Sequence, residues 1–264
     1  SGSLAQKTLW SVAAYGSVMR TRSVMKRSVE ITDNSFFSIF SDAVLLYDLA
    51  SSESNEHVRR TLSTSSILSV NYALEAAANS FLKSVDINSK ISAQVDRFST
   101  LDKFDFILQW HKEISLPRGD SETQIVKKLI EQRNQLVHPK VKVIKQDIVT
   151  SPGDDAVAYY HKADDSDSFE KCKITKMSLN PSNYGPEDSL IALKSLVNFL
   201  NKLVENWWGI DVPTSEILLM KSWNGSIQAN PIMYDQNELK VVLKHNDTLN
   251  IRFAGLYGIL EEYA

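Results

Sequence analysis

The segment that most constrains the fold is a long helical pattern over residues 54–85, "SNEHVRRTLSTSSILSVNYALEAAANSFLKSV". In its second half the apolar side chains recur every three or four residues, which places them on one face of a helix. That face consists of Ile67, Val70, Leu74, Ala77, Ala78, Phe81 and Val85. A long helix with one continuous apolar face is typical of a helical bundle, because it buries that face only against other helices.

Further helical patterns flank this segment. The helices expected after it cover residues 102–114, 119–138 and 185–208. Pro139 ends the second of these, because the residue before a proline is disfavoured in a helix. The sequence therefore predicts a mainly α fold: a four-helix bundle built from residues 55–140 together with 186–208.

The N-terminal part of the chain is predicted to be helical as well. A first helix is expected over residues 4–31, with a basic second half, "MRTRSVMKRS". A second helix follows over residues 32–52, opened by capping residues and closed by serines. Together they form a predicted N-terminal helical extension over residues 1–54.

Two segments have the alternating, β-branched pattern of short strands. "KVKVIKQDIV" and "CKITKMSL" flank an acidic, loop-like stretch and predict a β-hairpin insertion over residues 141–185. "ELKVVLKHNDTLNIRF" predicts a second hairpin with its turn at Asn246-Asp247. We therefore expect residues 209–264 to form a β-rich C-terminal tail.

Composition narrows the class of protein. The chain has 264 residues, 43% of them hydrophobic, with a net charge of −3, which gives ample core and no general attraction to nucleic acid. The single cysteine, Cys172, excludes an internal disulfide framework and suits a reducing cytoplasm. No apolar run reaches the ~18 residues of a membrane span. We expect a cytoplasmic protein with no membrane partner.

Metal and cofactor sites are not predicted. The histidines outside residues 119–138 are scattered over different elements and lack the spacing of metal ligands. With nine glycines in the whole chain there is no glycine-rich phosphate loop, so dinucleotide binding and P-loop ATP hydrolysis are excluded.

The stretch "LIEQRNQLVHPK", residues 129–140, places an arginine among apolar side chains. On a helical wheel Arg133 falls at about 80° from Ile125, at the centre of the apolar arc, while Asn134 and His138 share one flank. Burying an unpaired charge costs several kcal/mol. The arginine therefore needs a partner, an interface or a ligand.

One explanation is purely structural. Arg133 would pair with Glu75, which lies between Asn71 and Asn79 in a polar ladder of four-residue spacing along the edge of the long helix. In this interpretation His138 is a simple cap at the C-terminal end of its helix, stabilised by the helix dipole when it is charged.

The other explanation comes from a family resemblance. Arg133-Asn134-x-x-x-His138 near a helix end resembles the R-N-x-x-x-H signature of HEPN domains, and "ALEAAANSFL" and "LVHPK" are similar to segments of such proteins. The resemblance covers roughly residues 60–140 and 186–208. It implies a HEPN-like bundle and, as in many members, a metal-independent endoribonuclease with Arg133, Asn134 and His138 as catalytic residues. Glu75, Asn71 and Asn79 would support them.

That activity has clear chemical requirements. Metal-free RNA cleavage uses the ribose 2′-hydroxyl as nucleophile and needs a base, an acid and a cation for the phosphorane. A histidine serves as base or acid near neutral pH, and an arginine offers paired donors to phosphate oxygens. One chain carries one such histidine, so a composite site would need two copies of the motif across a homodimer interface.

The resemblance leaves two functions open. The first is an RNA-cleaving toxin or phage-defence effector, with an antitoxin or other protein as a further partner. The second is a non-catalytic HEPN-like module that binds a protein, a nucleotide or RNA.

Overall fold

The computed structural model describes residues 28–139, 141, 170–223 and 232–256. The helix predicted over residues 4–31 lies almost entirely outside the described residues, and its described end, residues 28–31, is not helical. The described part of the chain is mainly α, as predicted. None of its helices is both long and apolar enough to cross a membrane.

The elements follow one another as a series of helices with two very short strands. The α-helices are α1 (Phe36–Ser52), α2 (Glu56–Leu82), α3 (Ser89–Val95), α4 (Thr100–Lys112), α5 (Ser121–Val137), α6 (Pro186–Lys202), α7 (Val212–Leu219), α8 (Gln236–Lys244) and α9 (Asn246–Leu249). A 3₁₀ turn, η2 (Pro181–Asn183), precedes α6, and a π-helical segment, η3 (Leu203–Trp208), continues it. Strands β1 (Ile31–Thr32) and β2 (Ser222–Trp223) pair antiparallel, with Ile31 opposite Trp223.

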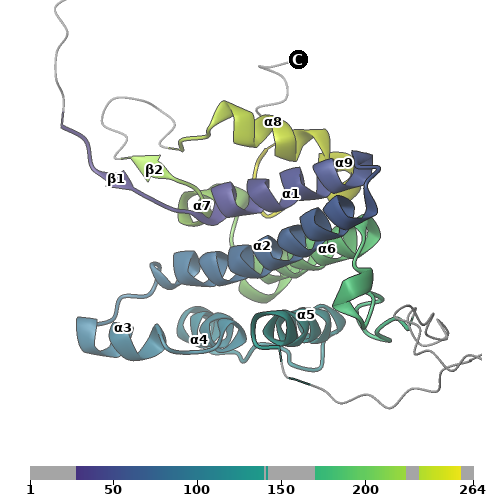
Figure 1. Cartoon of the computed structure of the whole chain (residues 1–264). Coiled ribbons are helices and arrows are strands. Elements are labelled where there is room, and N and C mark those ends of the chain that lie inside the picture. The colour runs from purple at the N-terminus through teal and green to yellow at the C-terminus, as the bar shows by residue number, and fades with distance from the viewer. Residues whose placement is uncertain (1–27, 140, 142–169, 224–231, 257–264) are drawn as a thin grey trace, which may run out of the picture.

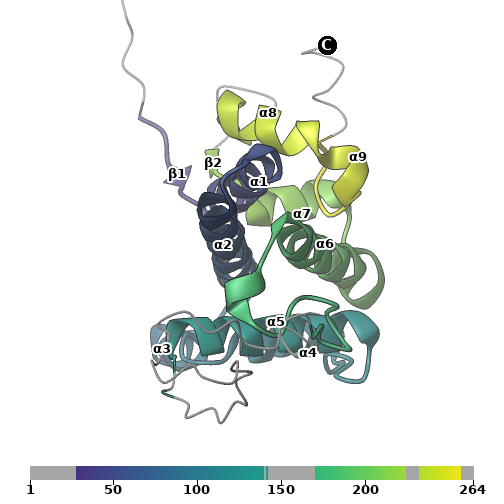
Figure 2. The ribbon, with the colours of Figure 1, turned by 45° about the vertical axis from the view of Figure 1, so that its right-hand side comes forward.

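The helices lie in three layers (Figure 1). Helices α2 and α6 form the middle layer, α1 with α7, α8 and α9 covers one side, and α3, α4 and α5 lie on the other. Figure 2 shows α5 below α2 and α6, and the Asp120 cap at the start of α5 contacts Lys202 at the end of α6. Helix α2 packs against α4, α5 and α6, so the four helices predicted to associate do pack together.

Small side chains on α2 allow this helix to pack against several other helices in the centre of the molecule. Ala73, Ala77 and Ala78 are fully buried, so neighbouring helices approach the α2 backbone closely. Buried serines add specific contacts: the Ser66 hydroxyl donates to the Ala43 carbonyl of α1, 2.8 Å away. The Ser189 hydroxyl of α6 donates to a carbonyl of α2. Helices α1 and α6 are thereby held on α2 by packing and hydrogen bonds together.

Caps mark three helix ends close to their predicted positions, whereas α1, α4 and the end of α2 differ from their predicted bounds by two to four residues. The Asn55 side chain accepts from the backbone N–H of Val58 at the start of α2. Asp120 accepts from the N–H of Glu122 at the start of α5. Gly209 follows η3 with a φ of 68°, the left-handed conformation that glycine adopts without steric cost.

The predicted C-terminal hairpin is wrong. Residues 236–249 form α8 and α9 instead. Asp235 caps α8 by accepting from two backbone N–H groups, and Leu239 and Val242, three residues apart, are its buried side chains. The short run "KVVL" alternates well enough to suggest a strand, but its helical face has a partner in α1, and packing decides between the two.

The predicted insertion hairpin also differs from the structure. Its first strand lies outside the described residues, apart from Val141. "CKITKMSL" is not a strand but folds back on itself: the Cys172 N–H donates to the Met177 carbonyl, and Lys176 adopts a left-handed φ of 66°. Among the described residues of this segment the one strand-like pairing is an antiparallel bridge between Lys171 and Ser178. Met177 at the end of the turn is fully buried in the hydrophobic core.

One hydrophobic core joins the segments that the sequence divides into extension, bundle and tail. Phe36 and Phe40 of α1 contact Phe253 edge-to-face, at centroid distances of 5.8 and 6.3 Å. The same cluster of buried side chains continues into α2 and α6. Residue 54 therefore marks a turn between two packed helices rather than a boundary between cores.

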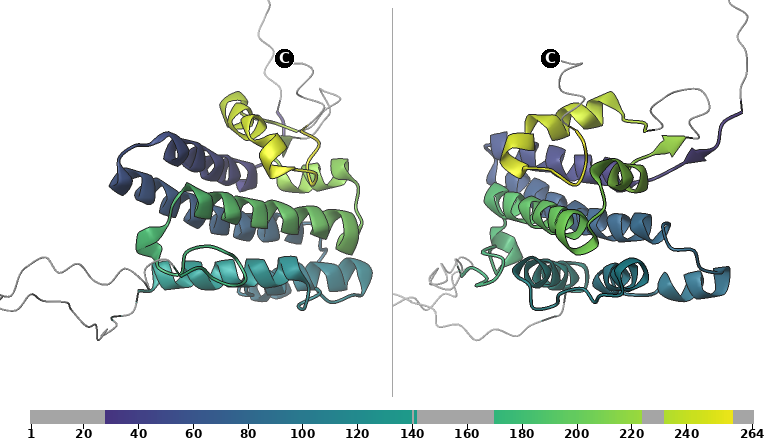
Figure 3. Two further views of the ribbon diagram at one scale, coloured as in Figure 1. Left: turned by 90° about the vertical axis from the view of Figure 1, so that its right-hand side faces the viewer. Right: turned by 180° about the vertical axis from the view of Figure 1, so that it is seen from behind.

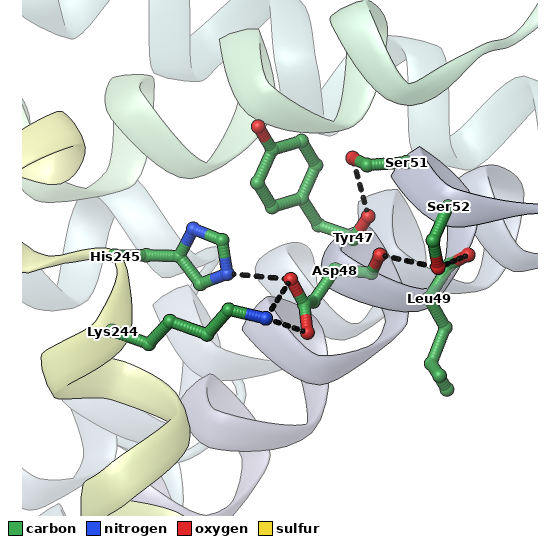
Figure 4. A network of polar contacts seen from close by, with 7 residues as sticks. All are labelled: Tyr47, Asp48, Leu49, Ser51, Ser52, Lys244 and His245. Carbon is green, nitrogen blue, oxygen red and sulfur yellow. Dashed lines mark hydrogen bonds and ion pairs between the residues drawn. The ribbon is translucent and has the colours of Figure 1, made fainter.

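A polar network holds α8 on α1 (Figure 4). The Lys244 ammonium donates to both carboxylate oxygens of Asp48, at 2.8 and 2.7 Å. His245 Nε2 lies 2.9 Å from the same carboxylate, and its ring packs edge-to-face on Tyr47. The hydrogen bond from Lys244 holds the pKa of Asp48 below its ordinary value, against the opposing effect of burial.

This network makes stability depend on pH in the acid range. Because the pKa of Asp48 is lower in the folded chain, its contribution is complete above the ordinary carboxyl pKa and is lost as the pH falls through the folded-state pKa. Asp48→Asn should cost about 1 kcal/mol at neutral pH, because two charge-assisted contacts disappear. Thermal melts from neutral to acid pH should show the gap to wild type closing in acid. Asp42→Asn, an exposed change on the same helix, is the control and should match wild type throughout.

Candidate functional site

Helix α5 carries the sequence motif, and both of its ends are anchored. At its start, Asp120 accepts a hydrogen bond from Lys202 of α6 at 2.6 Å, which lowers the pKa of Asp120. Near its other end, the buried Gln132 side chain contacts the turn formed by residues 172–178. Its Oε1 accepts from the Thr175 hydroxyl at 3.2 Å, and its Nε2 donates to the Ser178 carbonyl at 3.4 Å.

The apolar side chains of α5 become more exposed toward the end of the helix that carries the motif. Val126 and Leu129 are fully buried, whereas Leu136 is half-buried and Val137 is 42% exposed. The last turn of α5 therefore extends past the core, which opens the helix end to solvent.

Arg133 lies at this transition, as the helical wheel predicts. Its side chain is half-buried, and its Nε is fully buried without a hydrogen-bond partner in the described part of the chain. One terminal nitrogen, Nη1, donates to the Asn134 side-chain oxygen at 3.0 Å. The guanidinium carbon lies 6.0 Å from the centre of the Tyr72 ring on α2, a cation–π distance.

Asn134 and His138 are exposed on the same side of α5. The backbone N–H of His138 donates to the Asn134 carbonyl at 3.0 Å and closes the last turn of the helix. The predicted capping role of His138 is thus performed by its backbone. Its imidazole makes no hydrogen bond within the described residues and is free to meet a ligand or a second chain.

The predicted ion pair between Arg133 and Glu75 is wrong. The Glu75 carboxylate accepts instead from the Lys103 ammonium and the Thr100 hydroxyl, both on α4. Lys103 is only 3% exposed and also donates to the Asn79 side-chain oxygen at 2.8 Å. A buried ammonium needs an anion more than a half-exposed guanidinium does, so Lys103 determines where Glu75 lies.

The predicted supporting residues therefore serve different purposes. Glu75 and Asn79 hold α4 against α2 through Lys103. Asn71 is buried, and its amide nitrogen donates to the Ile67 carbonyl of its own helix, while its Oδ1 has no partner among the described residues. None of the three contacts the α5 motif through a hydrogen bond.

Two neighbours of the motif were missed in the sequence. Tyr72, 48% exposed, presents its ring to Arg133. Gln132 fixes the end of α5 to the turn at 175–178. Tyr72 is the residue after Asn71, the first member of the predicted polar ladder. An aromatic side chain just outside the apolar face of a bundle helix was the signal that could have drawn attention to it.

Known proteins offer no guide to this site. Comparisons with family models, with curated proteins and with solved structures each find no match to the chain. The functional interpretation therefore depends on the residues and their geometry.

A structural role and a ligand-binding role for Arg133 predict different effects of its substitution on the melting temperature. Arg133→Met keeps the apolar stem and removes a buried N–H that has no partner, so the melting temperature should stay level or rise. Glu75→Gln leaves the buried Lys103 ammonium with neutral partners only and should cost about 2–4 kcal/mol, or several degrees. Parallel thermal melts compare them. An Arg133→Met variant as unstable as Glu75→Gln would identify Arg133 as a structural residue.

Proposed function

We propose that the protein is a metal-independent endoribonuclease of the HEPN type, with Arg133, Asn134 and His138 as its catalytic residues. The observation that carries this proposal is the state of Arg133. Its guanidinium forms no ion pair within the described residues and lies beside the exposed amide of Asn134, in the same solvent-open helix end that carries the exposed His138.

The proposed reaction is transesterification at a phosphodiester. A base removes the proton of the 2′-hydroxyl, the 2′-oxygen attacks phosphorus, and the bond from phosphorus to the 5′-oxygen breaks. An acid returns a proton to that leaving oxygen, so the products are a cyclic 2′,3′-phosphate and a free 5′-hydroxyl. No metal is required, because the positive charge that stabilises the phosphorane comes from a side chain.

The residues divide these tasks by their chemistry. His138 transfers the protons, since an imidazole both accepts and donates near neutral pH. Arg133 binds the non-bridging oxygens with its terminal nitrogens, which are held at the site by Asn134 and the Tyr72 ring. Asn134 also has an amide nitrogen available for a phosphate oxygen.

A homodimer would supply the second histidine. Base and acid act on opposite sides of the phosphorus, and each chain carries one motif histidine. The exposed Val137 and Tyr72 beside the motif are apolar surface that a second copy of α5 would cover. A two-fold arrangement of the α5 ends would bring the two motifs to one cleft.

A biological role follows only from the family resemblance. Many HEPN ribonucleases are toxins or phage-defence effectors, and an antitoxin or another protein partner would then control the activity. We propose the same setting for this protein, with RNA as the substrate.

The direct test is RNA cleavage in the presence of EDTA. The wild-type protein should cleave, and His138→Ala and Arg133→Met should each lose about two orders of magnitude or more in rate, because each removes a group that acts in the transition state. Arg97→Met and His111→Ala are the same changes made outside the motif and should keep the wild-type rate. Cleavage by His138→Ala at the wild-type rate would eliminate the site assignment.

A second variant tests the dimer. Val137→Glu places a charge on exposed apolar surface next to the motif, so the monomer should fold normally. If two copies meet there, light scattering should show a shift from dimer to monomer, and cleavage should fall with it. A protein that is already monomeric, or a variant that cleaves normally, would contradict the composite site.

One observation favours a second candidate, a non-catalytic HEPN-like binding module. The His138 imidazole has no hydrogen-bond partner to orient it within the described residues, whereas catalytic histidines are commonly oriented by a neighbour. In that case the wild-type protein would bind RNA, a nucleotide or a protein through Arg133 and leave RNA intact. The EDTA assay, run with a binding measurement on the same RNA, separates the two candidates.

A further inference from the structure

A groove of about 620 Å³ lies at the start of α2, away from the α5 motif. One wall comes from the first turn of α2, and the other comes from Lys171, Ser178 and the residues around η2. Figure 3 (left) shows η2 and the corner between α1 and α2 on the same side of the molecule as the end of α5. The volume is in the range of small-ligand sites.

Two arginines line this groove without a carboxylate partner. Arg59 and Arg60 are both half-buried. The Arg59 guanidinium makes no hydrogen bond or ion pair in the described part of the chain. Arg60 Nη2 contacts only the Nδ1 of His57, at 3.1 Å, and as the arginine must donate, that nitrogen accepts. The positive charge of both groups is thus available to an anion.

The acidic residues nearby do not neutralise this charge. Lys171 reaches Glu187 at 3.7 Å, but both side chains are more than half exposed, and such a pair contributes little. Glu56 is the one carboxylate among the groove residues described, and it is exposed at the first position of α2. The groove therefore carries a net positive charge.

The two helix starts that line the groove are already capped. At α2 the Asn55 side chain accepts from the Val58 N–H, and at α6 the Asp188 carboxylate accepts from the Gly185 N–H at 2.9 Å. The attraction of the groove for an anion therefore comes from its arginine side chains rather than from helix ends.

A tyrosine hydroxyl at the groove gives a further indication of a ligand. Tyr184 lines the groove and is only 3% exposed as a residue, and its hydroxyl makes no hydrogen bond to the described part of the chain. Its oxygen is not among the fully buried atoms without a partner, so it remains accessible to a ligand. Burial raises the pKa of Tyr184 to about 12, so the hydroxyl stays protonated and is a donor at neutral pH.

We propose that this groove binds the phosphate group of a nucleotide, held by Arg59 and Arg60 and reached by the Tyr184 hydroxyl. An arginine fork fits phosphate oxygens in pairs, and the remaining space accommodates the rest of a nucleotide. The phosphate belongs either to a free mononucleotide or to an RNA chain. This site is distinct from the α5 motif and does not depend on RNA cleavage.

The experiment measures binding of two probes to the full chain. The first is adenosine 5′-monophosphate, by calorimetry. The second is a short single-stranded RNA with 2′-O-methyl groups, by fluorescence anisotropy. This RNA cannot be cleaved because its 2′-oxygens are blocked, so the binding measurement does not depend on the nuclease proposal.

The variants are Arg59→Gln, which keeps length and polarity, and Tyr184→Phe, which removes only the hydroxyl. Arg97→Gln, an exposed arginine outside the groove, is the matched control.

The expected result is a clear order of effects. Arg59→Gln should weaken binding about tenfold or more, because it removes a charge-assisted contact, and Tyr184→Phe should weaken it a few-fold. Arg97→Gln should bind like wild type. Glu56→Gln should strengthen binding, because it removes the one negative charge among the groove residues described. Melting curves of Tyr184→Phe should match wild type, since no hydrogen bond is lost.

The two probes separate the sources of the phosphate. Loss of mononucleotide binding in Arg59→Gln assigns the groove to a free nucleotide. Loss confined to the RNA, with a shallower salt dependence, assigns it to a nucleic-acid backbone. The proposal is overturned if neither probe binds the wild-type protein, or if Arg59→Gln and Tyr184→Phe bind both probes as tightly as Arg97→Gln.

Discussion

Close packing around α2 is the constraint on which the rest of the structure depends. Its buried alanines and serines let α1 and α6 lie directly on its backbone, while α4 and α5 contact its other side. This helix also contributes to both candidate sites: its first turn forms one wall of the cationic groove, and Tyr72 in its middle meets Arg133. A larger residue at the fully buried Ala73 or Ala77 would overpack the core around α2.

The described cations of this molecule differ in whether they have a carboxylate partner. The deeply buried ammonium of Lys103 takes the carboxylate of Glu75, whereas the half-buried guanidiniums of Arg59 and Arg133 form no ion pair within the described residues. Because Arg59 and Arg133 are partly exposed and have no carboxylate partner there, they are available to bind external anions. This contrast is the physical basis for placing ligands at both arginine positions, and it connects the α5 motif with the groove.

The sequence predicted what depends on local periodicity and missed what depends on which surfaces meet. The helices with long apolar faces are confirmed, as is the position of Arg133 on the apolar side of α5. Glu75 was assigned to the wrong cation, because a helical wheel gives the direction of a side chain but not the residue opposite it. The short run "KVVL" fits a strand as well as a helix, and only contact with α1 decides it. The groove combines segments more than 100 residues apart, so no local pattern reveals it.

The contact between α1 and α8 has a consequence for synthesis of the chain. Lys244 and Asp48 are 196 positions apart, and Phe253 covers the two phenylalanines of α1 from still farther along the sequence. A ribosome releases α1 together with α2, which covers much of its apolar surface, but the part of α1 that contacts α8 and Phe253 stays uncovered until residues 236–256 emerge. Deletion of α8 and α9 with Phe253 would leave that part of α1 exposed permanently.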